Sequence, residues 1–417
     1  MESPGVSRRP KTILILATLD TKEDEVVFLK ERVHQRGHRV LTVDAGVLRD
    51  PRAKPDVSRH EVASAGGRPL DELLQSGDKG LCVQTMIRGA ARTVRELWDQ
   101  KRFDGIISVG GAQGAAIGTA AMRALPFGVP KLMVTTVASG QARFGDFVGT
   151  SDLTIMHCVA DMFGINMLTA KVLSIAAGAI VGMVEAAGEV SCAEKRPRVA
   201  MTVLGNTTPA GMTIKSLLQE RGWEVVGFHA NGTGGVAAEA LIAEGCFDAM
   251  LDLTTHELVD REYGGQHGAI ADTRLQEAGK AGIPQVVVPA CIDYLVFGDR
   301  QSVPARFQGR PYVVHNPQIT LVRASAEEMT RVASIMVQRL NQAKGPAAVA
   351  IPLRGLSMHN IEGQAFFDPQ ADRACRDVFR QKLRPDVPLR EIDAHVNDPA
   401  FAAMCVDLLL EIQVTKH

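Results

Sequence analysis

Two threonines, an acid and a lysine follow the first apolar run of the chain, TILILA, within the segment TLDTKEDE. Asp20 could hold a metal ion or a hydroxyl group, and Lys22 could meet a polyphosphate as a point charge. Thr18 and Thr21 add hydroxyl groups beside them. The alternative is helix capping, in which Asp20 or Thr21 caps a following helix whose first turn is acidic. The segment is therefore a candidate ligand-binding loop with a competing structural explanation.

A second candidate loop is the glycine-rich run VGGAQGAAIG, which contains Gly110, Gly111, Gln113 and Gly114. Glycines between a strand and a helix expose backbone N–H groups to an anion at the positive end of the helix. No Gly-Lys-Ser/Thr follows, so this is not a Walker A loop, and the dinucleotide fingerprint would follow the first strand instead. The competing explanation is close packing of a helix on a sheet through glycines four residues apart. We expect phosphate binding here.

Further polar residues stand at the ends of neighbouring apolar runs. Asp44, in TVDAG, occupies a position at which an acid often binds a ribose, and it could equally be a turn residue. Thr136 ends the run PKLMVTT, and Ser139 and Gly140 follow it. Because ligands of open parallel sheets bind beyond the carboxyl ends of the strands, we expect these residues to join the nucleotide site.

The second half of the chain carries a similar set of candidates. The loop HANGTGG contains Thr233 and begins at His229, and Glu257 follows the run CFDAMLDLTTH. We expect these three side chains to act in catalysis on a small substrate. The string HELVD resembles the HExxH zinc signature but ends in Asp260, and it lies at a strand exit rather than within a long helix. The sequence therefore disfavours a zinc site at HELVD, and no residue is assigned there as a metal ligand.

These loops need a framework of strands to bring them together. Short apolar runs without alternation are typical of parallel strands that are buried on both faces and joined by crossover helices. The landmarks QRG, RFDG and GVPK of the first half match ERG, CFDA and GIPQ of the second in the same order, which predicts two related domains. The expected fold class is α/β, with two Rossmann-like domains at residues 1–190 and 197–417, each a mostly parallel sheet flanked by helices. The first would carry the nucleotide phosphate loops and the second the substrate side.

Composition excludes several classes of protein. The 417 residues contain 46 Lys plus Arg and 47 Asp plus Glu, so no net charge attracts nucleic acid or an anionic membrane. Seven cysteines without a C-x-x-C pattern are typical of reduced thiols, and we expect a cytoplasmic protein. The longest uncharged apolar stretch, residues 172–184, is shorter than the roughly 20 residues of a membrane-spanning helix.

Eight motifs in order carry a resemblance that covers residues 12–412. They are TLDTKEDE, GGAQGAAIGTAAM, GTSDLTIMHCVADMFGIN, GNTTPAG, FHANGTGGVAAE, LDLTTHELVDREYGG, HNPQITLVRASAEEM and IEGQAFFDPQAD. Together they resemble the bacterial relatives of the ATP-binding N-terminal region of the tomato mosaic virus resistance protein. The resemblance implies two Rossmann-like domains, nucleotide binding and a homodimer. Because the plant protein has a further TIM-barrel-like region, it also suggests a separate TIM-barrel enzyme as a partner.

The sequence thus predicts an ATP-binding protein that uses Mg²⁺. We expect an ATP-dependent enzyme that acts on a small anionic metabolite in an interdomain cleft, by phosphoryl transfer or by activation of an acid. The alternative is a non-catalytic ATP-sensing module that regulates a partner protein. An NAD(P)-dependent dehydrogenase is a third, less favoured hypothesis, because the glycine loop follows the third strand rather than the first.

Overall fold

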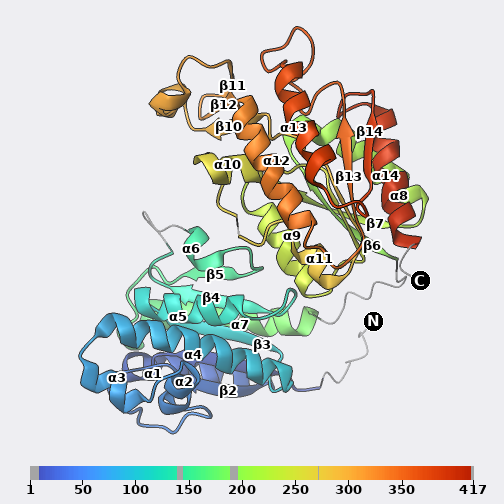
Figure 1. Cartoon of the computed structure of the whole chain (residues 1–417). Coiled ribbons are helices and arrows are strands. Elements are labelled where there is room, and N and C mark those ends of the chain that lie inside the picture. Colours follow the sequence, from blue (N-terminus) through green and yellow to red (C-terminus); the bar gives the residue numbers. More distant parts are fainter. Residues whose placement is uncertain (1–8, 139–143, 188–195, 271, 415–417) are drawn as a thin grey trace, which may run out of the picture. The chain divides into compact units, whose positions relative to one another are not determined.

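Hydrogen bonding between parallel strands builds one main sheet in each half of the chain. The computed structural model describes residues 9–138, 144–187, 196–270 and 272–414. The chain divides into two units, Met1–Ala193 and Glu194–His417, each with its own internal contacts. Figure 1 shows the N-terminal unit in blue to green and the C-terminal unit in green to red. The predicted α/β class with two Rossmann-like domains is confirmed.

The N-terminal unit contains a five-stranded sheet in which all neighbouring strands are parallel. The apolar runs predicted to be strands lie at its centre, because such runs can be buried on both faces. In spatial order the strands are β2 (Arg39–Asp44), β1 (Thr12–Ala17), β3 (Gly105–Gly110), β4 (Lys131–Thr135) and β5 (Thr154–His157).

Helices cover both faces of this sheet. Alternate residues of β1 point to opposite faces, so Leu14 and Leu16 join one hydrophobic cluster while Ile13 and Ile15 join another. The first cluster contains helices α2 (Arg59–Ala65), α3 (Leu70–Ser76), α4 (Lys79–Asp99) and α5 (Ala112–Arg123). The second contains α1 (Leu19–His34) and α7 (Met167–Ala186), and a short helix α6 (Phe144–Val148) follows β4.

Helix α7 is longer than the uncharged stretch that the sequence analysis considered. It has 20 residues and is long and apolar enough, by length and composition alone, to cross a membrane. A core helix passes the same test, and α7 packs on the sheet through Leu173, Ala177, Ile180 and Val184. The sheet contact explains the apolar composition of this helix face.

The C-terminal unit repeats the same strand order in a six-stranded sheet, again with parallel neighbours. In chain order its strands are β6 (Arg198–Val203), β7 (Glu224–His229), β8 (Ala249–Asp252), β9 (Gln285–Val287), β13 (Ala347–Pro352) and β14 (Leu389–Ile392). Their spatial order is β14-β13-β9-β8-β6-β7, which matches the N-terminal order with one strand added. The two halves therefore share one topology, as the matched landmarks predicted.

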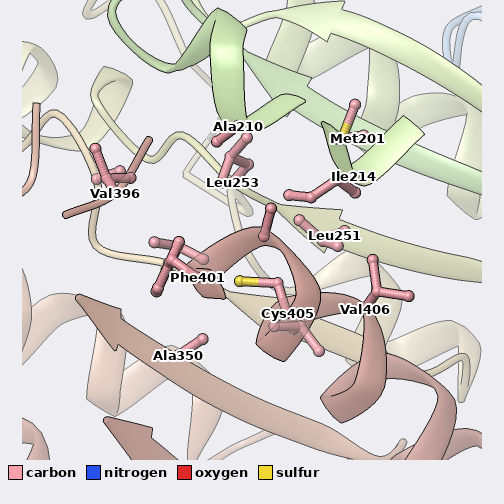
Figure 2. Packing of buried hydrophobic residues seen from close by; sticks show 14 of the residues in the cluster. Met201, Ala210, Ile214, Leu251, Leu253, Ala350, Val396, Phe401, Cys405 and Val406 are labelled. Atoms are coloured by element: carbon pink, nitrogen blue, oxygen red, sulfur yellow. The ribbon is translucent and has the colours of Figure 1, made fainter. Parts of the chain in front are cut away.

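The core of the C-terminal unit also has two helical layers. One face packs against α8 (Thr208–Glu220) and α14 (Pro399–Val414), and Figure 2 shows Ile214, Phe401 and Val406 packed with Leu251 of β8. The other face packs against α9 (Gly234–Ala243), α11 (Glu277–Ala281), α12 (Ala326–Leu340) and α13 (Pro369–Lys382). A shorter helix, α10 (Glu257–Tyr263), follows β8.

An additional antiparallel sheet in the C-terminal unit was not among the predicted elements. It contains β10 (Tyr294–Phe297), β12 (Ile319–Arg323) and β11 (Tyr312–Asn316), in that spatial order. Short 3₁₀ helices lie at Gly205–Thr207, Arg300–Ser302 and Ala305–Phe307. The turn Asn316-Pro317 joins β11 to β12, and this Asn-Pro pair is the sequence signal that could have identified the hairpin.

The shared topology places a natural ligand position in each unit. In an open parallel sheet the chain first winds outward in one direction and then in the other, so the loops after two neighbouring strands diverge and leave a crevice. In the N-terminal unit this switch point lies between β1 and β3, and in the C-terminal unit it lies between β6 and β8. The loops after these strands are the ones with the polar candidate residues.

The packing of α5 on β3 yields a stability prediction. A Cβ at Gly118 would lie 2.4 Å from Ser108 Oγ and 2.8 Å from its Cβ, so Gly118→Ala forces the helix away from the strand. We expect a loss of about 1–3 kcal/mol in the free energy of unfolding, measured in urea. The matched control is Gly182→Ala in α7, where no atom lies within 4 Å of the new Cβ. It should stabilise by roughly 0.5–1 kcal/mol, and equal effects of the two substitutions would contradict the packing role.

Candidate functional site

A pocket of about 550 Å³ opens at the switch point of the N-terminal unit. It lies between the loop after β1 and the loop after β3, the two loops that the sequence analysis selected first. The lining residues are Thr18, Asp20, Thr21, Lys22, Val47, Leu48, Leu73, Leu74, Gly77, Lys79, Cys82, Gly111, Ala112, Gln113, Gly114 and Asp161. Seven of the predicted cofactor-binding residues, Thr18, Asp20, Thr21, Lys22, Gly111, Gln113 and Gly114, are therefore brought together.

Two helices begin at this pocket without a side-chain cap. Helix α5 starts after Gly111, which has no side chain to cap it, and α1 starts after Thr18, which makes no capping hydrogen bond. The first N–H groups of a helix have no acceptor within the helix, and the end carries a partial positive charge. Asp44 Oδ1 accepts from the N–H of Leu19 at 3.0 Å, so the end of α5 is the more open of the two. This end is a ready anion-binding position.

The glycines of VGGAQGAAIG divide between two roles. A Cβ at Gly110 would lie 2.8 Å from the Cα of Gly114, and Gly118 has no more room against Ser108. Gly110 and Gly118 therefore let α5 approach β3. A Cβ at Gly111 would meet nothing nearer than Thr136 Oγ1 at 3.9 Å, so Gly111 presents open backbone to the pocket. The packing and anion-binding explanations both apply, at different glycines.

Two buried acids tie the loop after β2 to the loop after β1. Asp20 Oδ2 accepts from the N–H groups of Val47 and Leu48 at 2.7 and 2.8 Å. Asp44 Oδ1 accepts from the N–H of Gly46 at 2.8 Å in addition to Leu19. Asp44 thus caps the first N–H of α1 from outside the helix, whereas Asp20 does not cap α1 and instead holds Leu48 at the pocket wall.

The structure places Asp44 differently from the ribose-binding position expected for it. Asp44 is completely buried, and it is not among the lining residues of the pocket. Burial raises the pKa of its carboxyl group, against the lowering effect of the two backbone N–H donors. Asp44 therefore holds the loop after β2 and is not brought together with the pocket residues, and the predicted ribose contact stays a prediction.

Two lysines line the pocket, and only one was expected. Lys22 leaves helical geometry at φ −124° and ψ 22°, and its ammonium donates to the carbonyl oxygen of Met162. Lys79 is exposed in the first turn of α4, after the N-cap Asp78. Lys79 is not evident as a site residue from the sequence, because α4 does not follow a strand. The Asp-Lys-Gly sequence after Gly77 was the available signal of a helix start.

The remaining predicted cofactor residues lie at or beyond the edge of this site. Thr136 is half-buried, close to the open side of Gly111. Thr18 and Thr21, by contrast, belong to the pocket lining, where their hydroxyl oxygens share a hydrogen bond of 3.1 Å. Ser139 and Gly140 lie outside the described residues, so their part in the site stays a prediction.

The three predicted catalytic residues of the C-terminal unit differ in exposure, and the one carboxylate among them is already hydrogen-bonded. Glu257 is completely buried: Oε1 accepts from the N–H groups of Gly232 and Gly235, and Oε2 accepts from Arg274 Nε at 2.9 Å. His229 and Thr233 are exposed, and Thr233 donates to Asn231 Oδ1 at 3.0 Å. The carboxylate of Glu257 is thus occupied in shaping the glycine loop.

Arg274 organises this part of the C-terminal unit. Its guanidinium is buried and also pairs with Asp252, with which it forms two hydrogen bonds, and with Glu239. Burial alone would lower the pKa of Arg274, but the three carboxylates outweigh this effect and raise the pKa well above its usual value. The guanidinium therefore stays charged. One cation and three acids leave a buried network whose function is to fix the loops after β7 and β8.

A cationic pocket of about 980 Å³ lies elsewhere in the C-terminal unit, beside the first turns of α12 and α13. Arg310, Arg323 and Arg373 are among its lining residues. Arg323 is only 6% exposed; its Nη1 donates to the carbonyl oxygen of Asp293, and its Nε has no hydrogen-bond partner among the described residues. These arginines were not predicted from the sequence, because they come from three separate segments.

A pH dependence follows from Asp372, which pairs with Arg323 at 3.3 Å. Burial raises the pKa of Asp372 from 3.8 to about 7, although Arg323 opposes the shift. As pH rises, the carboxyl group of Asp372 loses its proton near pH 4 in the unfolded chain but only near pH 7 in the folded chain. The free energy of unfolding therefore falls progressively as pH rises from about 4 to about 7. Relative to wild type, Asp372→Asn should gain roughly 1.4 kcal/mol per pH unit in this range. Urea unfolding of both proteins at several pH values checks this, and a constant difference would refute it.

Two family models match the chain. The model described as the N-terminal domain of the uncharacterised protein family UPF0261 matches residues 11–189. The model described as the C-terminal domain of the same family matches residues 196–413. Together they cover both units of the structure.

Individual relatives agree with the family models. A UPF0261 protein of Clostridium tetani is 38% identical over 403 residues, which cover 96% of this chain and 99% of that protein. The tomato ToMV resistance protein Tm-1(GCR237) of Solanum lycopersicum is 31% identical over 421 residues, which cover 96% of this chain and 55% of that protein. The predicted resemblance to relatives of the tomato protein is confirmed.

The chain also has a weak similarity to solved structures. A UDP-N-acetylglucosamine 2-epimerase from Rickettsia bellii covers 98% of this chain and 97% of its own, at 12% identity and a TM-score of 0.24. So low a score carries no argument about function.

Proposed function

The chain belongs to the uncharacterised protein family UPF0261, and we propose that its N-terminal unit binds ATP together with Mg²⁺ in the pocket between β1 and β3. One observation carries the proposal: the uncapped N-terminus of α5 opens into a pocket at the switch point of a parallel sheet. Both features favour a phosphate group at that position. The resemblance to the ATP-binding region of the tomato protein supports the same nucleotide.

The chemistry of the pocket matches the parts of a nucleotide. Its volume of about 550 Å³ lies within the range of roughly 300–1,000 Å³ found for small-molecule sites. Lys22 and Lys79 would neutralise phosphate oxygens, and the N–H groups of Gln113 and Gly114 would donate to them. Leu48, Leu73 and Leu74 offer an apolar wall for the base. The polar and apolar residues thus suit the two ends of ATP.

The residues present also suit a magnesium ion. Mg²⁺ prefers oxygen ligands and is commonly held by one or two protein groups together with substrate phosphates. Asp20 contributes a carboxylate and Thr18 a hydroxyl group to the lining of the pocket. When bound, the ion would neutralise charge on the phosphates. Asp20 is oriented by its hydrogen bonds to Val47 and Leu48, and Thr18 by its hydrogen bond with Thr21.

A lysine substitution tests nucleotide binding. Lys79→Met removes a charge from the pocket while keeping the length of the side chain, and we expect ATP affinity to fall by about tenfold or more. The control is Lys30→Met, which removes a lysine from the exposed side of α1 outside the pocket lining. Isothermal titration with ATP and Mg²⁺ measures both. Equal affinities of the two variants, or no heat of binding in the wild-type chain, would count against the site.

We extend the proposal to an ATP-dependent enzyme that acts on a small anionic metabolite by phosphoryl transfer or acid activation. The support is the cationic pocket of the C-terminal unit, where Arg323 and Arg373 suit a carboxylate or phosphate group. Arg373 is exposed and reaches this pocket from α13. In such reactions positioning and charge neutralisation provide most of the rate enhancement, so no buried general base is required.

The second candidate is a non-catalytic ATP-sensing module that regulates a partner protein. One observation favours it: both carboxylate oxygens of Glu257, one of the three predicted catalytic residues, are already hydrogen-bonded. A dehydrogenase is less favoured still, because the buried Asp44 does not line the pocket. A homodimer remains part of the proposal, as does a separate TIM-barrel enzyme as partner. Phe163 and Met167, which are 92% and 80% exposed, offer apolar surface for such contacts.

Turnover distinguishes the enzyme from the sensor. Purified chain with Mg²⁺ and ATP should consume ATP when a suitable carboxylate or phosphate metabolite from a broad panel is present. Arg373→Ala should raise the KM for that metabolite by about tenfold while ATP affinity is unchanged, because one charged hydrogen bond is lost. ATP retention without consumption for every metabolite would instead support the sensor and exclude the enzyme proposal.

A further inference from the structure

Three ligand-type side chains lie together at the switch point of the C-terminal unit. His256 and Asp260 follow β8 and stand one helical turn apart, and His267 comes from the loop after α10. His256 and Asp260 are completely buried, and His256 Nε2 lies 3.3 Å from Asp260 Oδ2. One ligand atom from each of the three residues lies within 4.8 Å of the others. The cluster is separate from the Arg274 network, which uses Glu257.

The hydrogen bonding of His256 leaves one ring nitrogen available. Its Nδ1 lies 2.8 Å from the carbonyl oxygen of Cys291, and a carbonyl oxygen only accepts, so Nδ1 must carry the hydrogen. In the neutral ring the lone pair is then on Nε2, which faces Asp260. This is the arrangement by which proteins orient histidines that bind metals, with the second nitrogen donating to a backbone carbonyl.

Two buried ring nitrogens of the cluster, His256 Nε2 and His267 Nδ1, make no hydrogen bond within the described residues, although one of them, His256 Nε2, faces Asp260 Oδ2. A proton shared between His256 and Asp260 would satisfy one nitrogen and leave His267 Nδ1 without a partner. Buried polar atoms are seldom left in this state.

The backbone of the loop between α10 and His267 turns back, so that this histidine lies beside Asp260. Gly264 ends the helix at φ +80°, in the left-handed region. A Cβ at Gly265 would lie 2.0 Å from Asp260 Oδ1, so only glycine fits there. The N–H of His267 then donates to Asp260 Oδ2 at 2.9 Å. The fold thus holds the third residue of the cluster beside the first two.

Neighbouring groups hold the cluster in place. The ring of His256 stacks on Tyr294 with 4.7 Å between ring centres, and the ring of His267 meets it edge-on at 5.3 Å. Asp260 Oδ1 accepts from the N–H of Val296 at 3.0 Å, which leaves Oδ2 turned toward the histidines. Ligands that are oriented before binding lose little conformational entropy when an ion arrives.

We propose that His256 Nε2, His267 Nδ1 and Asp260 Oδ2 bind a divalent transition-metal ion of the zinc type. Imidazole nitrogen and carboxylate oxygen are preferred ligands of Zn²⁺ at about 2.0–2.2 Å, and tetrahedral geometry then separates ligand atoms by about 3.4 Å. The His256–Asp260 pair already has this separation. Three protein ligands leave the fourth position open for water or a substrate group, as in catalytic rather than structural zinc sites.

The proposed site differs from the sequence interpretation of HELVD, which disfavoured a metal there. That prediction compared HELVD with HExxH and rejected it because the last residue is an acid. The signal it overlooked was His267, which follows Asp260 after a helix end and two glycines. The pattern His-x₃-Asp-x₆-His contains the whole ligand set.

Metal titration of the full chain tests the proposal. After treatment with a chelator, the wild-type protein should bind one Zn²⁺ per chain in competition with a chromogenic chelator. His267→Gln should lower Zn²⁺ affinity by at least about tenfold. His315→Gln, which removes an exposed histidine from β11 in the same unit, should bind as wild type. Absence of stoichiometric binding in the wild type, or equal affinity in His267→Gln, would overturn the site.

A spectroscopic measurement on the wild-type chain keeps the test independent of variant folding. Co²⁺ substituted for Zn²⁺ should give visible absorption typical of nitrogen and oxygen ligands in four- or five-coordinate geometry. It should show no thiolate charge-transfer band, because the buried Cys291 contacts His256 through its backbone carbonyl oxygen and its thiol is not a proposed ligand. A thiolate band, or the spectrum of free hexa-aqua Co²⁺, would contradict the proposed ligands. These readouts do not depend on ATP binding by the N-terminal unit.

Discussion

The close contact of helix α5 with strand β3 is the constraint on which the N-terminal site depends. Gly110 and Gly118 leave no room for a Cβ, so the helix lies against the strand and its first turn opens directly at the carboxyl edge of the sheet. Asp20 and Asp44 then draw the loop after β2 toward the same edge through four backbone hydrogen bonds, to Val47, Leu48, Leu19 and Gly46. These buried carboxylates therefore hold the loops in place, and neither of them caps the N-terminus of α5, which stays free for a ligand.

The two units share one topology but differ in the polar groups at their switch points. Each has its switch point between the first and third strands of its sheet, and each carries polar groups there. In the N-terminal unit these groups are backbone N–H donors and lysines, which suit an anion. In the C-terminal unit His256 and Asp260 occupy the equivalent loop, and their lone pairs suit a cation. The sheet decides where a ligand can bind, and the loop residues decide which charge it carries.

Sequence reasoning was most successful where a residue follows a strand directly. Gly111, Gly114 and Asp20 lie in the pocket because a parallel strand delivers the next residues to its carboxyl edge. It failed where tertiary contacts decide: Lys79 reaches the pocket from a helix remote from any strand end, and Arg274 occupies the carboxylate of Glu257 from a distant loop. No periodicity or turn signal reports such pairings, since they depend on how separate segments pack.

We expect the phosphates of ATP to bind at the start of α5, and a crystal structure of the full chain with Mg²⁺ and a non-hydrolysable ATP analogue would locate them. Phosphate oxygens should lie within hydrogen-bond distance of the N–H groups of Gln113 and Gly114, with Lys79 beside them. An analogue bound elsewhere, or a pocket without nucleotide at saturating concentration, would contradict it.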